Sequence, residues 1–156
     1  MPILDSEEEL PLEFRGRLRF GKTRDIALQI ANFSAYGGDV NEKTFKRRTK
    51  QLALDIINLV GSLPGSRASA VIGRQLLRSG TSVGANYRAA CRGRSKADVA
   101  SKLAIVEEEA DETSYWIELL IEARIVPLSR VNGLLNEANE IIAMTVASIR
   151  TLRGRT

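Results

Sequence analysis

VASKLAIVEEEADETSYWIELL, residues 99–120, decides the fold class of this chain. Its apolar and small side chains recur at alternating intervals of four and three residues, at Val99, Leu103, Val106, Ala110, Thr113, Ile117 and Leu120. This heptad spacing is typical of a long helix that packs in a bundle or coiled coil. Ser95, followed by Asp98, forms a capping-box start for the helix, and Pro127 ends it.

Three further helical patterns accompany this one. The expected helices cover residues 44–62, 66–92, 95–124 and 129–152. Ser66 and Ser129 are the expected N-caps of the second and fourth helices, and Gly93 is a suitable C′ residue after the second. Because long helices with short connections pack as antiparallel neighbours, the pattern predicts an all-α, up-down-up-down four-helix bundle.

The chain divides near residue 43. Residues 1–43 hold six Lys/Arg and eight Asp/Glu, whereas residues 44–156 hold 17 Lys/Arg and 11 Asp/Glu. The first segment has no sustained period, so we expect an N-terminal extension of loop or disordered chain before the bundle domain. Two hypotheses remain for it: native translation starts at a GTG codon for Val40, or the segment is an arm that contacts a neighbouring subunit. In either case, deleting residues 1–39 should leave the bundle's stability nearly unchanged.

Composition excludes several kinds of chemistry. A chain of 156 residues fits one domain. It has no histidine, which excludes histidine bases, Ser-His triads and histidine metal ligands. Cys91 is the single cysteine, so the simplest interpretation is a reduced, cytoplasmic protein in which this thiol has a packing role. No signal peptide is visible in the sequence and no apolar run of 18 residues occurs, so we expect no membrane partner.

Small and polar residues break the apolar pattern of the second expected helix, QLLRSGTSVGANYRAACRGRSK, residues 75–96. Gly80 and Gly84 lie one turn apart and predict the close approach of a neighbouring helix. Beside the core face runs a structural polar stripe, which with its expected partners on the third helix comprises Gln75, Ser79, Ser82, Asn86, Glu109 and Glu112. We expect Asn86 to bind a carboxylate of the third helix and so to fix the register of the two helices.

Arginines occupy the opposite face of the same helix. Arg74, Arg78, Arg88 and Arg92 fall within about 80° of one another and form a stripe roughly 27 Å long. Two further basic clusters lie at the start of the first helix and at the end of the fourth. Since clustered arginine suits phosphate contacts, the candidate nucleic-acid-binding residues are Arg74, Arg78, Arg88, Arg92, Arg94, Lys96, Arg47 and Arg48. The alternative is an ordinary solvated face.

Two Glu-x-x-Glu pairs raise an enzymatic alternative. Glu109 and Glu112 form one pair, and Glu137 and Glu140 form the other. If neighbouring helices brought the pairs together, four carboxylates would hold Mg²⁺, as in the all-α nucleotide pyrophosphohydrolases that this pattern loosely resembles. Such pairs are also common on solvated helices, and no nucleotide pocket is evident beside them. We therefore assign no metal, cofactor or catalytic residue.

The stretches QLLRSGTSVGAN, ending at Asn86, and EEADETSYW, ending at Trp116, carry a resemblance to a family. From about residue 44 to 153, the chain resembles the four-helix-bundle proteins encoded in intervening sequences of bacterial large-subunit ribosomal RNA. That family in turn is similar to the accessory variability determinant of diversity-generating retroelements. The resemblance implies a ring-like homopentamer with basic surfaces, and no established enzymatic activity. Since the retroelement relatives bind nucleic acid and a reverse transcriptase, the resemblance also implies these two as partners.

The sequence therefore predicts a non-enzymatic, basic, homo-oligomeric bundle that binds RNA or another nucleic acid through its arginines. Apolar residues beyond one bundle seam support self-assembly, namely Leu119, Leu120, Ile121, Leu134, Leu135, Ile141 and Ile142. Two alternatives remain open: the magnesium-dependent nucleotide hydrolase, and a protein-interaction adaptor with no nucleic-acid role.

Overall fold

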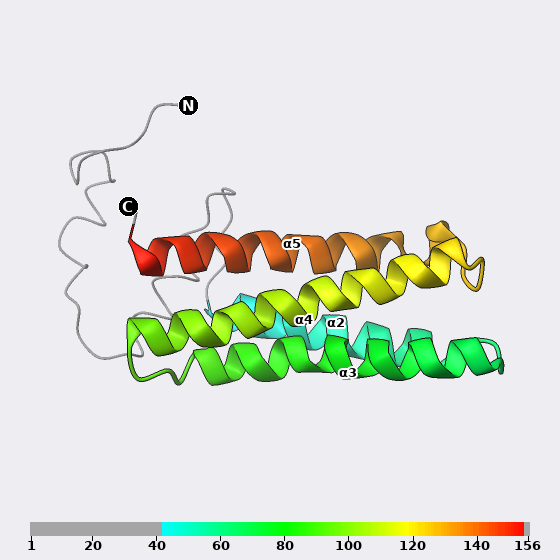
Figure 1. Ribbon diagram of the computed structural model, residues 1–156, viewed down its shortest axis with the longest axis horizontal. Helices are drawn as coiled ribbons and strands as arrows, with labels where there is room; N and C mark the ends of the chain where they lie inside the picture. Colours follow the sequence, from blue (N-terminus) through cyan, green and yellow to red (C-terminus); the bar gives the residue numbers. More distant parts are fainter. Residues whose placement is uncertain (1–41, 155–156) are drawn as a thin grey trace, which may run out of the picture.

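The computed structural model describes residues 42–154, which form a bundle of four α-helices. These are α2 (Glu42–Gly61), α3 (Arg67–Ala90), α4 (Lys96–Glu122) and α5 (Leu128–Arg153). Successive helices run in opposite directions, so the beginnings of α2 and α4 lie at the same end as the last turns of α3 and α5 (Figure 1). The expected all-α four-helix bundle is confirmed. The expectations for residues 1–41 lie outside the described residues.

The heptad positions of α4 form the centre of the core. All seven expected positions are buried, and the most exposed of them, Leu103, is only 3% exposed. α4 packs against α3 on one side and α5 on the other, while α2 packs mainly against α3. Leu52 and Ile56 from α2, Leu76 from α3 and Ile141 from α5 complete a fully buried centre. No helix within residues 42–154 has the length and apolarity needed to cross a membrane.

Serine side chains begin two of the helices, as expected. Ser66 Oγ accepts a hydrogen bond from the amide of Ser69 at 3.1 Å, and Ser95 Oγ accepts one from the amide of Asp98 at 3.1 Å. The expected cap at Ser129 is wrong. α5 begins two residues earlier than a cap at Ser129 would place it, and extended Pro127 precedes it without a side-chain cap hydrogen bond. Proline has a fixed φ and no amide hydrogen, so it suits a helix start without a capping side chain.

The glycine after α3 has a different role from the expected one. Gly93 does not take the left-handed conformation of a C′ residue; among the described glycines, only Gly154 has a positive φ. A Cβ at Gly93 would lie 2.5 Å from Val99 Cγ2, so glycine is needed there because the first turn of α4 packs directly on it. The left-handed residue of the bundle's turns is Arg124, φ 57°, which follows α4.

Small residues bring α2 and α3 close together. A Cβ added to Gly80 would lie 2.2 Å from Ile56 Cδ1, well inside van der Waals contact. At Gly84 the same atom would lie 3.4 Å from the carbonyl oxygen of Thr49, an ordinary contact distance. The close approach expected from these two glycines is therefore confirmed, and α2 is the helix that approaches.

Candidate nucleic-acid interface

The antiparallel topology gathers three separate basic segments at one end of the bundle. These segments are residues 42–50, 88–102 and 150–153, which we call the basic end. They contribute twelve lysines and arginines and only two carboxylates. They come from the start of α2, from the α3–α4 connection with its flanking turns, and from the last turn of α5, all on the left of Figure 1.

The rest of the bundle has the opposite charge. Residues 51–87 and 103–149, which we call the acidic part, hold five arginines and ten carboxylates. From residue 103 to 122, α4 carries no lysine or arginine at all. A polyanion is therefore attracted to one end of the molecule and repelled from most of its length.

The topology divides the arginine stripe of α3 between these two regions. Arg74, Arg78, Arg88 and Arg92 are all exposed on the outer face of the helix. Arg88 and Arg92 lie in the basic end, whereas Arg74 and Arg78 lie in the acidic part. Within residues 42–154, Arg78 is the member of the stripe that forms ion pairs, so the four arginines are not equivalent.

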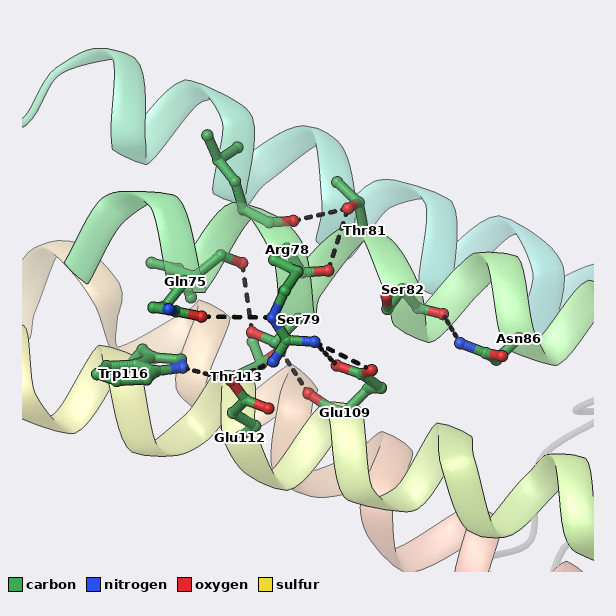
Figure 2. Close-up of polar contacts among 12 residues, drawn as sticks. Gln75, Arg78, Ser79, Thr81, Ser82, Asn86, Glu109, Glu112, Thr113 and Trp116 are labelled. Atoms are coloured by element: carbon green, nitrogen blue, oxygen red, sulfur yellow. Dashed lines mark hydrogen bonds and ion pairs between the residues drawn. The ribbon is translucent and has the colours of Figure 1, made fainter. Parts of the chain in front are cut away.

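Arg78 is held by the first Glu-x-x-Glu pair (Figure 2). Its guanidinium forms an ion pair with Glu112 and also lies 3.2 Å from Glu109 Oε2. Trp116 Nε1 donates to the same Glu112 carboxylate at 2.9 Å. The hydrogen bond from Arg78 is the main cause that lowers the pKa of Glu112, and the one from Trp116 is the second. The hydrogen bond with Glu112 is also the main cause that raises the pKa of Arg78. This arrangement fixes α3 against α4 and partly neutralises a cation expected to bind phosphate.

Beneath this ion pair lies a buried hydroxyl pair. The hydroxyls of Ser79 and Thr113, both fully buried, are 3.0 Å apart across the α3–α4 contact. Gln75 Oε1 accepts a hydrogen bond from Arg78 Nε at 3.3 Å. The bond between Ser79 and Thr113 joins α3 to α4 at a fixed register, whereas that between Gln75 and Arg78 lies within α3.

The partner of Asn86 differs from our expectation. Asn86 Nδ2 donates to the carbonyl oxygen of Ser82, one turn earlier in α3, at 2.9 Å. The carboxylates expected to bind Asn86, those of Glu109 and Glu112, bind Arg78 instead. A charged guanidinium binds a carboxylate more strongly than a neutral amide does.

The second Glu-x-x-Glu pair holds Arg48 in the same way, across the contact between α2 and α5. Arg48 Nε and Nη2 lie 2.7 and 2.8 Å from the two carboxylate oxygens of Glu137, and Nη2 also forms an ion pair with Glu140. The side chain of Arg48 is only 22% exposed. Sequence reasoning missed this role, although pairs of acids three residues apart on α4 and α5 were a usable signal.

These contacts also remove the geometric basis of the magnesium alternative. One acidic pair faces α3 and the other faces α2, on different seams of the bundle, and each is bound to an arginine. Within the part of the chain that the structure describes, no three acidic or cysteine side chains come together as metal ligands.

The aromatic side chains near the basic end are buried. Phe45 and Tyr87 are 4% and 5% exposed and pack against each other with tilted rings, their centroids 4.2 Å apart. The exposed aromatic residue of the bundle, Tyr115, lies in the acidic part beside Trp116. The basic end therefore offers phosphate contacts without a described platform for stacking bases.

Cys91 packs at the edge of the core, 5% exposed. Burial is the main cause that raises the pKa of its thiol. Since the thiolate is the reactive form, we expect Cys91 to react with iodoacetamide at neutral pH far more slowly in the folded protein than in urea. Equal rates measured by mass spectrometry would contradict the packing role.

The sequence matches the family model of the 23S rRNA-intervening sequence proteins over residues 42–147. The chain belongs to this family. The chain is also similar to a protein of unknown function from the S23 ribosomal protein family of Bacteroides thetaiotaomicron, known from a crystal structure. The two are 37% identical, with a TM-score of 0.64 over 68% of this chain and 98% of that chain. Among curated proteins, none matches the chain. The family match covers all but the last residues of the bundle, as the resemblance read from the sequence predicted.

Proposed function

We propose that this member of the 23S rRNA-intervening sequence family is a non-enzymatic, self-assembling protein that binds RNA through its basic end. The observation that carries the proposal is the convergence of three basic segments at one end of an otherwise acidic bundle. Arg88 and Arg92 are the contact residues best supported by position, since both are exposed in the basic end and make no ion pair within residues 42–154. Arg94, Lys96, Arg150 and Arg153 extend the same surface.

The chemistry favours a double-stranded or folded RNA without sequence preference. Arginines that contact phosphates neutralise backbone charge and release counterions, so affinity depends strongly on salt. A duplex presents a higher charge density than a single strand, and the basic end lacks the exposed aromatic side chains that single strands stack on. A homo-oligomer, which the family resemblance leads us to expect as a pentamer, would repeat the basic end and strengthen binding by avidity.

The test compares two double variants with equal charge loss. Arg88→Gln/Arg92→Gln removes two cations from the basic end, and Arg67→Gln/Arg124→Gln removes two exposed cations from the opposite end. At about 0.1 M salt, the first should weaken retardation of duplex RNA by about ten- to a hundred-fold. It should also reduce the slope of log affinity against log salt by about 2.

The control variant should bind nearly as the wild type does, because its arginines lie away from the basic end. Equal losses in the two variants would reject the basic end as the interface. Retention of full affinity by Arg88→Gln/Arg92→Gln would also reject it. Binding a single strand of the same length more tightly than the duplex would overturn the choice of ligand.

A further inference from the structure

The outer face of α2 combines positive charge with exposed apolar side chains. Arg47, Lys50, Leu54 and Ile57 follow at intervals of three, four and three residues and lie within about 80° of one another. All four are exposed, Leu54 by 44% and Ile57 by 47%. A helix face that exposes two large aliphatic side chains beside two cations is suited to a partner that is apolar and acidic.

The outer face of α4 has that composition and the same spacing. Glu108, Asp111, Tyr115 and Glu118 also follow at intervals of three, four and three residues, and all four are exposed. Tyr115 is 51% exposed, and half-buried Leu119 lies one turn further along the helix. Because α4 has no cation between residues 103 and 122, the charge of this face is purely negative.

The two faces lie on opposite corners of the bundle and run in the same direction. α2 packs on α3 and α5 rather than on α4, and α2 and α4 both start at the basic end (Figure 1). They are also level. On α3, Gly84 lies five residues, about 7.5 Å, after Ser79. Thr49 of α2 packs on Gly84, and Thr113 of α4 is the hydrogen-bond partner of Ser79. Five residues back from Thr113 on antiparallel α4 is Glu108, so Thr49 and Glu108 stand at about the same height.

We infer that the outer face of α2 packs, in parallel, on the outer face of α4 of a second copy of this chain. In this register Arg47 and Lys50 lie opposite Glu108 and Asp111 and are no longer RNA contacts of the basic end, and Leu54 lies opposite Tyr115. The inference rests on the self-assembly that we propose above and names the surfaces that make it. Each copy gives one face to each neighbour. The paired positions differ in height by two residues, about 3 Å, so the copies are related with little slide along the helices. A head-to-tail contact of this kind closes into a ring only when the two faces are inclined to each other.

The apolar residues first expected to drive assembly do not compete with these faces. Leu120 and Ile141 are fully buried within the single bundle, and Ile121, Leu134, Leu135 and Ile142 are partly buried against the same core, whereas Leu119 adjoins the outer face of α4. A second copy is the partner that the structure favours, because this chain itself carries the acidic face that matches the basic one in spacing and height.

Charge reversal tests the pairing, with light scattering on RNA-free protein at micromolar concentration and low salt. The wild type should have several times the mass of one chain, 17.2 kDa. Arg47→Glu/Lys50→Glu and Glu108→Arg/Asp111→Lys should each reduce the mass to that of one chain, because each opposes like charges. The quadruple variant that combines all four changes should regain the wild-type mass, since it restores opposite charges with reversed sign.

Two matched controls accompany these variants. Arg67→Glu/Arg124→Glu makes an equal charge change outside both faces and should keep the wild-type mass. Leu54→Ser/Ile57→Ser should dissociate the assembly, whereas Leu128→Ser, at a residue 52% exposed on α5, should not. Circular dichroism checks that each variant is folded.

A wild type of single-chain mass, reversed variants that stay assembled, or a quadruple variant that stays dissociated would each overturn the inference. Arg88→Gln/Arg92→Gln should keep the wild-type mass while losing RNA affinity. Failure of the interface and failure of the RNA-binding proposal therefore give different results.

Discussion

Replacing Gly80 with leucine is expected to destabilise the bundle by about 3 kcal/mol or more, although leucine is the better helix former. The first atom of the new side chain would already lie 2.2 Å from Ile56 Cδ1, and Ile56 is fully buried, so the three further carbons of leucine need space that the core must open. The added volume must push α2 away from α3. Urea denaturation followed by circular dichroism measures the loss.

A double-mutant cycle identifies the cause. Gly80→Ala gains up to about 1 kcal/mol in helix propensity and loses about 1–3 kcal/mol through overpacking. Ile56→Val removes the Cδ1 methyl that the new Cβ meets, so the two changes together should cost less than the sum of their separate costs. Gly84→Ala is the matched control. Its Cβ would meet Thr49 at an ordinary 3.4 Å, so stability should stay the same or rise. Equal destabilisation by Gly80→Ala and Gly84→Ala would contradict the close packing.

Much of this fold could be predicted from the sequence because it depends on local periodicity. The seven heptad positions of α4 are all buried, and Ser66 and Ser95 cap their helices, because spacing along one helix fixes which side chains share a face. The failures at Ser129 and Gly93 are also physical. Proline can begin a helix without a side-chain cap, and a glycine can be required by a neighbouring side chain rather than by its own φ.

The candidate site could be predicted only in part, because it depends on which helices meet. A helical wheel places Arg48 and Arg78 on exposed or half-exposed faces but does not show the acids of the neighbouring helix. Each arginine proved to be bound by two glutamates across a seam. Conversely, the sequence contained three separate basic clusters, and only the antiparallel topology shows that they meet at one end.

Replacing Arg48 with methionine is expected to lower the free energy of unfolding by about 1–3 kcal/mol. Methionine keeps much of the apolar stem but leaves the carboxylates of Glu137 and Glu140, one turn apart on α5, without their cation. Removing one partner of a buried pair costs about 3–5 kcal/mol, and this pair is partly exposed, so the expected loss is smaller. Arg74→Met, at an exposed arginine of α3, should change stability by no more than about 0.5 kcal/mol.

Removing the acids together with the arginine should recover most of the loss. In Arg48→Met/Glu137→Gln/Glu140→Gln no charge is left unpaired at the contact between α2 and α5, so stability should approach that of the wild type. The same variants decide between the two roles of Arg48. If the role of Arg48 is to join α2 to α5, the Arg48→Met variant should lose stability while its folded fraction still binds duplex RNA at low salt. A variant of wild-type stability that no longer retards RNA would instead restore Arg48 to the nucleic-acid contacts first expected from the sequence.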